Sequence, residues 1–176
     1  TVVVPFDSPN LIESKSFKLY LNSFNQTRVQ DISQLYLTLQ QDLSACAGKP
    51  VEVTIHHVNE LVAFQPTWLP GRCIDELDVE INSYQYDASL LQLAENAMPV
   101  EEKLHSHLLK SNCLITSQPD WASVFIHYKG KAIEHASLLR YLISFRQHNE
   151  FHEQCVERIY QDIYQLAKPE FLAVYA

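Results

Sequence analysis

The feature of this chain that most constrains its fold is an internal repeat. The segment IESKSFKLYLNSFNQ, which begins at Ile12, aligns with IEHASLLRYLISFRQ, which begins at Ile133, and more than half of the aligned positions are identical. The correspondence continues in QDL (41–43) against QDI (161–163), and in Lys49-Pro50 against Lys168-Pro169. Because unrelated segments rarely agree to this extent, we expect two copies of one structural unit.

Each copy shows the same order of expected elements: a strand, two helices and another strand. Runs of β-branched and aromatic residues mark the strands, and apolar residues at helical spacing mark the helices. In the first copy these segments are 2–6, 16–24, 31–47 and 50–58, and in the second 123–128, 137–145, 149–167 and 170–176. Asp31 is expected to cap a helix, and Pro50 and Pro169 to end helices. The order predicts an α+β fold, in which helices cover one face of an antiparallel sheet.

The repeat also predicts the domain layout. We expect a first repeat over 1–84, a connecting helical segment over 85–110 and a second repeat over 111–176. A strand at 77–84 is expected to pair with 51–58, and a helix is expected over 101–112. The second copy stops where the first continues into its last strand, and bare apolar edge strands invite aggregation. Either the natural chain is longer at both ends, which we expect, or partner subunits supply those edges.

Composition narrows the functional class. The net charge of −8 argues against a protein that binds a nucleic-acid backbone, because that affinity comes mostly from a basic surface. No apolar run approaches the length of a membrane span, and the first ten residues lack the pattern of a secretory signal. The four cysteines are widely spaced and form no CxxC pair, which favours a reducing cytoplasm. A small-molecule ligand is therefore expected.

The stretch SNCLITSQPDW (111–121) raises the first chemical question. Cys113 is expected in a connecting loop, where functional residues concentrate, with Asp120 seven residues later. A nucleophilic thiol needs surroundings that favour thiolate and a group that moves protons, and Asp120 can be that group. The alternatives are a buried apolar cysteine and a metal ligand.

A second cluster is HNEFHEQC (148–155). A helix places His148 and His152 on one face, and this spacing can bind zinc with Cys155 or Cys113 as a further ligand; a solvated helix start is the alternative for His148. The pair His152-Glu153 follows Phe151, so an aromatic face, a switchable donor and a carboxylate come together. A carboxylate can accept two parallel N–H bonds from a guanine-like edge.

The third cluster lies in ESKSFKLYL (13–21). Ser14, Lys15, Ser16 and Lys18 form a compact set of phosphate-compatible donors near a helix start, although a solvated helix face is the ordinary alternative. The second copy has Ala136 in place of Lys15. The remaining histidines show no convincing ligand pattern and are interpreted as structural or surface residues: His56, His57, His105, His107, His127 and His135.

Taken in this order, ESKSFKLYL, SNCLITSQPDW and SFRQHNEFHEQCVERI (144–159) closely resemble the QueF family, the nitrile reductases of queuosine biosynthesis, in its long two-repeat bacterial form. The similarity runs through nearly the whole chain. It implies tandem tunnelling-fold repeats and NADPH-dependent reduction of 7-cyano-7-deazaguanine (preQ0) to the 7-aminomethyl compound (preQ1). Reduction of a nitrile to an amine takes four electrons, hence two NADPH per turnover, and the family chemistry requires no metal.

The resemblance also implies roles for single residues. Cys113 would add to the nitrile carbon and form a covalent thioimide, Asp120 would donate the proton, and His152 is the first alternative donor. The base would be held by His152 and Glu153 with Phe151 against its ring, and by Glu13, Ser14 and Lys15 of the first repeat. Lys15 and Ser16 would contact NADPH. Long members carry a Gly- and Arg-containing segment after the strand that matches 170–176, and this sequence ends before it.

The divergence of the two copies predicts one site built from both. Asp31-Ile32 stand where the second copy has His152-Glu153, so neither copy holds every residue of the set. Two other interpretations stay open: a zinc-dependent purine or pterin hydrolase of the same fold, with Cys113 and His152 or His148 as ligands, and a purine-binding subunit without catalysis. We expect a homodimer in the cytoplasm, without nucleic-acid or membrane binding.

Overall fold

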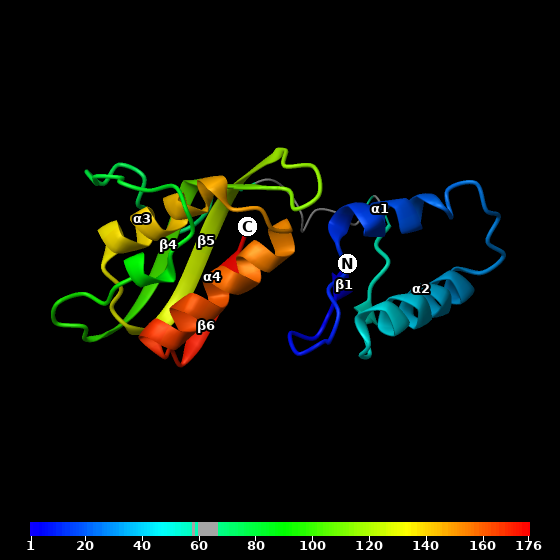
Figure 1. Cartoon of the computed structure of the whole chain (residues 1–176). Helices are drawn as coiled ribbons and strands as arrows, with labels where there is room; N and C mark the ends of the chain where they lie inside the picture. Colours follow the sequence, from blue (N-terminus) through cyan, green and yellow to red (C-terminus); the bar gives the residue numbers. More distant parts are fainter. Residues whose placement is uncertain (58, 60–66) are drawn as a thin grey trace. The chain divides into compact units, whose positions relative to one another are not determined.

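The computed structural model of the chain describes residues 1–57, 59 and 67–176. They belong to two compact units, Thr1–Thr67 and Trp68–Ala176, which appear in Figure 1 in blue to cyan and in green to red. In the described part of the chain, none of the helices combines the length and the apolar character needed to cross a bilayer.

The first unit packs two helices against a short antiparallel strand pair. Its elements are β1 (Val2–Val3), α1 (Ser14–Asn22), α2 (Ile32–Ala47) and β2 (Glu52–Val53). Val2 pairs with Val53, and Asp31 caps α2 by accepting the Ser33 N–H at 2.9 Å, as the sequence predicts. A small buried cluster forms the core: Leu39, Leu43, Ala47, Val51 and Val53.

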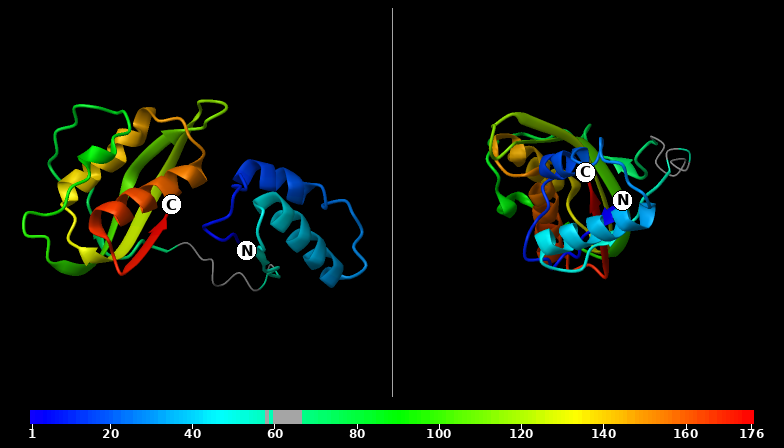
Figure 2. Two further views of the ribbon diagram at one scale, coloured as in Figure 1. Left: turned by 60° about the horizontal axis from the view of Figure 1, so that its bottom comes forward. Right: turned by 90° about the vertical axis from the view of Figure 1, so that its right-hand side faces the viewer.

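The second unit is a four-stranded sheet covered by helices on one face. Its elements are β3 (Arg72–Cys73), the 3₁₀ turn η2 (Ala88–Leu90), β4 (Pro99–Asn112), β5 (Pro119–Lys131), α3 (His135–Ser144), the 3₁₀ turn η3 (Phe145–Gln147), α4 (His152–Ala167) and β6 (Phe171–Tyr175). The strand order is β3-β4-β5-β6, and β4 and β5 form a long hairpin (Figure 2).

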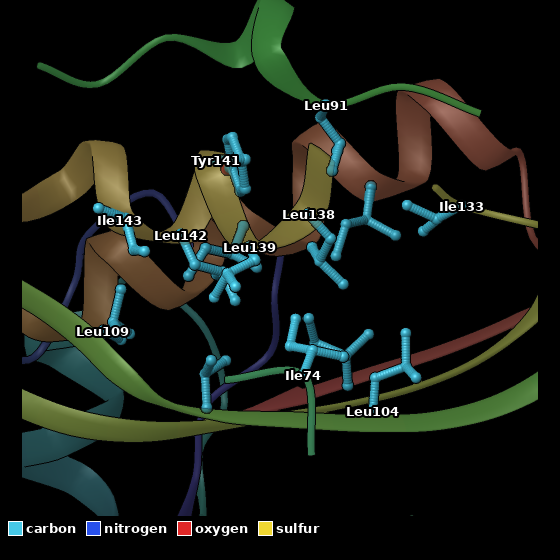
Figure 3. Close-up of a cluster of buried hydrophobic side chains, with 14 of the residues drawn as sticks. Ile74, Leu91, Leu104, Leu109, Ile133, Leu138, Leu139, Tyr141, Leu142 and Ile143 are labelled. Atoms are coloured by element: carbon cyan, nitrogen blue, oxygen red, sulfur yellow. The ribbon is translucent and has the colours of Figure 1, made fainter. Parts of the chain in front are cut away.

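The core of the second unit lies between α3, α4 and the sheet. Leu138, Leu139 and Leu142 of α3 face the layer that holds Ile74 and Leu104, as Figure 3 shows. Burial of this many large apolar side chains is the main stabilising term of a domain of this size. The α+β class, with helices on one face of the sheet, is therefore confirmed, and it is consistent with a tunnelling fold. The sheet is mixed, however, because β3 runs parallel to β4.

Equivalent hydrogen bonds recur in the two units. The Tyr20 hydroxyl donates to Asp42 at 2.7 Å in the first, and the Tyr141 hydroxyl donates to Asp162 at 2.5 Å in the second. Glu13 and Glu134 each accept two backbone N–H groups at the start of the following helix: those of Lys15 and Ser16, and those of Ala136 and Ser137. These matched contacts support the duplication that the sequence predicts.

The helix expected over 101–112 is wrong, because these residues belong to β4. Positions that face the core alternate up to Ser106, and a bulge between Ser106 and Leu109 then shifts the alternation by one residue. The bulge leaves Leu104, Leu108 and Leu109 at a spacing that resembles a helical face. The expected connecting helical segment is thus a strand in its C-terminal part.

The strand expected at 77–84 is also wrong. Leu77, Val79 and Ile81 do alternate toward the core, but the segment packs there without forming a ladder, and its contacts place it in the second unit. Its expected partner shortens to Glu52–Val53 within the described residues, and position 58 lies outside them. Apolar alternation therefore predicted burial here but not strand pairing.

Candidate functional site

Cys113 is the first residue of the loop between β4 and β5. Its N–H donates to the Gln118 carbonyl at 2.8 Å, and its carbonyl accepts the Ser117 N–H at 2.9 Å, so the loop closes directly on the cysteine. Ser117 takes a left-handed conformation with φ of 55°. The Cys113 side chain is only 6% exposed, whereas Ile115 at the loop tip is 75% exposed. The cysteine is thus largely shielded from solvent, whereas the tip of its loop is not.

Asp120 lies beside the loop, in the second position of β5. Its register partner is Ser111 of β4, so the two side chains share one face of the hairpin. Ser111 is buried, and its side chain forms a hydrogen bond with the Cys155 thiol of α4. Burial raises the pKa of Cys155 to about 11, and the charges of Glu150 and Asp120 add to this shift. Asp120 therefore lies near Cys155 of α4, at the end of the β4–β5 hairpin.

A backbone bridge brings the HNEFHE segment to the same place. The Asn112 N–H donates to the His148 carbonyl at 2.8 Å, and the Glu150 N–H donates to the Asn112 carbonyl at 3.0 Å. The Asn149 amide also donates to the Ser117 hydroxyl at 2.9 Å. The chain that leads into α4 thus lies along the residue that precedes Cys113 and along the Cys113 loop itself.

The aromatic and acidic residues of this motif start α4. Phe151 occupies the cap position in an extended conformation, and its side chain makes no capping hydrogen bond. His152 and Glu153 form the first turn, and all three side chains are half-buried. A first-turn carboxylate lies where the helix dipole favours negative charge. The structure therefore assembles Cys113, Asp120 and the Phe151–Glu153 segment around the end of one hairpin.

His148 has a different environment from the one zinc binding requires. Its Nε2 lies 2.8 Å from Glu150 Oε2, and Arg158 grips the same carboxylate with two nitrogens, at 2.9 and 2.5 Å. The Arg158 guanidinium also lies over the Tyr86 ring, 5.0 Å from its centroid. These contacts, those of Arg158 first, hold the pKa of Glu150 below its usual range.

The side chains expected to bind zinc do not lie close together in the described part of the chain. Across residues 1–57, 59 and 67–176, the potential ligand atoms of Cys113, His148, His152 and Cys155 form no close cluster. Sequence reasoning missed the Glu150–Arg158 pair, because eight positions separate its members and Glu150 precedes the helix. It also missed Asn112 and Asn149, whose role depends on a bridge between distant segments.

The candidate site residues of the first unit lie at the start of α1. Glu13 accepts the N–H groups of Lys15 and Ser16 at 2.7 and 2.8 Å and the Ser16 hydroxyl at 2.9 Å. The Lys15 N–H, first among these donors, holds the pKa of Glu13 below its ordinary value. The carboxylate thus occupies the helix N-terminus, and the exposed side chains of Lys15 and Lys18 are the groups that suit a phosphate. Ser14 is exposed as well.

Comparison with known families identifies the class. A family model described as the N-terminal part of a nitrile reductase, 7-cyano-7-deazaguanine reductase, matches residues 1–55, and a model described as a QueF-like protein matches residues 119–176. Together the two matches cover more than half of the chain. The duplicated α+β chain is thus of the nitrile reductase class.

More specifically, the chain belongs to the QueF family. The order of the matches, with one in each unit, is consistent with the long form that the sequence motifs predict. The matched ranges include Glu13, Lys15, Asp120 and the Phe151–Glu153 segment, whereas Cys113 lies between them.

Proposed function

We propose that this protein reduces the nitrile of preQ0 to the aminomethyl group of preQ1 with NADPH, through a thioimide on Cys113. The observation that supports this proposal is the bridge from Asn112 to His148 and Glu150, because the Cys113 loop lies beside the segment that we propose binds the base. Family membership supplies the substrate class. The zinc hydrolase alternative loses support, since its ligands do not converge in the described chain.

The first step is a redox-neutral addition. The S–H bond of Cys113 breaks, the sulfur bonds to the nitrile carbon, one C–N π bond is lost, and the nitrogen receives a proton. The proton released by the thiol replaces the one that the donor gives up, so the step balances. Asp120 is the proposed donor, because it lies beside the loop and a carboxylic acid at this position can transfer a proton as the C–S bond forms. His152 is the second candidate for this role.

The later steps consume four electrons. Two hydrides and two protons convert the thioimide carbon and nitrogen to an amine, and the C–S bond breaks to return the Cys113 thiol. NADPH supplies the hydrides when it binds, one from each of two molecules. The chain's own residues hold the purine-like base, keep the carbon at the loop and deliver protons to nitrogen.

The proposed base contacts come from side chains already oriented by α4. Glu153 offers a carboxylate for two adjacent N–H groups of the deazaguanine, His152 offers a ring nitrogen, and Phe151 offers an aromatic face. Glu13, Ser14 and Lys15 of the first unit are further proposed contacts to the substrate.

Lys15 and Ser16, the two residues proposed to contact NADPH, differ in how well they suit this role. Lys15 is exposed and cationic, which suits a phosphate, whereas the Ser16 hydroxyl and N–H are already committed to Glu13. The proposed phosphate contact is therefore the Lys15 side chain, with Ser16 acting through the cap. A cytoplasmic homodimer that binds neither nucleic acid nor membrane is part of the same proposal.

Intact-mass spectrometry after mixing with preQ0, without NADPH, tests the proposed intermediate. We expect a mass increase equal to one preQ0 per chain, and Cys113→Ala should abolish it. Cys46→Ser is the matched control, since Cys46 is an exposed thiol that lies far from Cys113 in the sequence. The adduct should persist in this variant. An adduct that survives Cys113→Ala would rule out this nucleophile.

A further inference from the structure

Three metal-ligating side chains gather outside the site described above. Cys73, His105 and His107 each offer one ligand atom, and these three atoms all lie within 4.8 Å of one another. Cys73 is the second residue of β3, and the two histidines alternate with the buried Ser106 along β4. Since successive strand residues point to opposite faces, both rings lie on the face of the sheet away from the helices.

The fold brings the cysteine to the histidines by a parallel pairing of two strands. Cys73 is the register partner of His105, and the following Ile74 N–H donates to the His105 carbonyl at 3.0 Å. Ile74 is itself 1% exposed and anchored in the core. The position of the thiol is therefore fixed by backbone bonds and by a buried neighbour, although the thiol itself is exposed.

Gly71 allows this close approach. Its φ is +87°, and a Cβ at this position would lie 2.0 Å from the Lys103 carbonyl oxygen. Only a residue without a side chain permits both the left-handed backbone and the contact with β4. The glycine thus sets how near Cys73 comes to the histidine strand.

In both histidines Nδ1 has an oxygen partner, so Nε2 is the nitrogen proposed to bind a metal. His105 Nδ1 lies 3.2 Å from the Pro70 carbonyl oxygen, which only accepts, so Nδ1 carries the proton and Nε2 keeps its lone pair. His107 Nδ1 lies 2.7 Å from the Ser123 hydroxyl, which can accept in the same way. Support of this kind, in which the second ring nitrogen is held by an oxygen, is what metal-ligating histidines have.

We propose that Cys73, His105 and His107 bind a divalent transition-metal ion of the zinc class. One thiolate and two imidazoles suit zinc, and a fourth tetrahedral position is left for water or another ligand. A tetrahedral zinc ion holds such ligand atoms roughly 3.3–3.6 Å apart, as bond lengths of about 2.3 Å to sulfur and 2.0–2.1 Å to nitrogen require. Small rotations of these three side chains, of which two are exposed and His105 is half-buried, would close the difference.

The ion would clamp β3 to β4. These strands share only two register pairs, Arg72 with Leu104 and Cys73 with His105, so a metal bridge adds a strong link to a short ladder. An ion that binds the folded protein alone raises its stability by mass action. The site lies on a part of the fold that the proposed reduction does not use, so it stands or falls separately from that function.

Titration of the metal-free protein with Co²⁺ tests the proposal, because cobalt replaces zinc and reports its ligands in the absorption spectrum. We expect one equivalent to bind with a thiolate-to-cobalt charge-transfer band and the visible bands of tetrahedral geometry. Zn²⁺ should displace it. His105→Gln and His107→Gln should each weaken binding by roughly tenfold or more.

Two cysteine variants form a matched pair for this titration. Cys73→Ser should lose the charge-transfer band, and Cys46→Ser, which removes the exposed thiol of the first unit, should keep it. Gly71→Ala should weaken the affinity, since the added methyl group displaces β3 from β4. A band that persists in Cys73→Ser, or the absence of stoichiometric binding by the unaltered chain, would overturn the site. Adduct formation with preQ0 should be unchanged in Cys73→Ser.

Discussion

At the scale of single residues, the second unit holds two buried cysteines in unlike surroundings. Cys155 is fully buried in α4, and its pKa of about 11 keeps it a neutral thiol at physiological pH. Cys113 is also largely buried, but it starts a loop whose tip is exposed, whereas Cys155 lies within a helix. The proposed nucleophile is thus the cysteine of the loop, and Cys155 belongs to the core.

Asp120 provides the sharpest test of the proposed proton transfer. Asp120→Asn keeps the size of the side chain but removes its ability to donate a proton as an acid. We expect turnover to fall by roughly 10²-fold or more, the usual scale of general acid catalysis, while preQ0 still binds. Steady-state NADPH oxidation and preQ0 titration give the two measurements. Asp78→Asn, at an exposed position in the same unit, is a control that should leave turnover unchanged.

Near-normal turnover of Asp120→Asn would contradict the assignment. In that case His152→Gln should carry the loss instead. If neither variant lost turnover, the proton would come from neither side chain.

At the scale of secondary-structure elements, sequence patterns predicted the helices better than the strands. Asp31 caps α2 as expected, because capping is a local property that short sequence windows contain; the caps Glu13 and Glu134 of α1 and α3 were not predicted. The strand β4 was mistaken for a helix, because its bulge and its inward polar residues Ser106 and Ser111 disrupt the alternation.

The candidate sites show the same difference between local and non-local signals. The loop position of Cys113 follows from nearby residues, whereas the bridge from Asn112 to His148 depends on pairing between distant segments. Cys73 and His105 come together only through a parallel register that no short window displays. The histidines therefore looked unrelated in the sequence.

The entrance to α4 depends on an ion pair that acid should weaken. Because Arg158 and His148 lower the pKa of Glu150, this carboxylate stabilises the fold fully above its unfolded-state value of about 4.5, and the contribution is lost as pH falls through the lower folded pKa. Glu150→Gln should lower the free energy of unfolding by about 2 kcal/mol at pH 7. The difference from the unaltered chain should shrink below about pH 4.

Urea unfolding at several pH values measures this difference. The matched control is Glu170→Gln, because Glu170 pairs with Lys129 at 2.6 Å but has a side chain that is 74% exposed. Such surface pairs contribute at most about 1 kcal/mol, so this variant should change little. An effect of Glu150→Gln that stays the same from pH 7 to well below pH 4 would show that ionisation of Glu150 is not coupled to folding.

At the scale of the whole molecule, the duplication gives two copies of one Tyr–Asp contact in different surroundings. Tyr141 is completely buried, and its hydroxyl shares Asp162 with the Tyr86 hydroxyl. Tyr20 makes the equivalent bond to Asp42 in a smaller and more open unit. Each unit has its own apolar core. Tyr20 and Tyr141 can therefore be substituted separately, and the effects of the same change can be compared in the two units.

We expect Tyr141→Phe to destabilise the second unit by about 1.5–3 kcal/mol, because a buried hydrogen bond to a carboxylate is lost while Tyr86 still satisfies part of Asp162. Tyr20→Phe should cost the first unit less, since water can replace the lost bond there. Hydrogen exchange read by mass spectrometry resolves the two effects, because peptides from α2 and α4 report separately on the units. Tyr141→Phe should accelerate exchange in α4, and Tyr20→Phe should do so in α2. If either substitution accelerated exchange equally in both helices, the two units would open as one cooperative structure. The two copies of the repeat would then not unfold independently of each other.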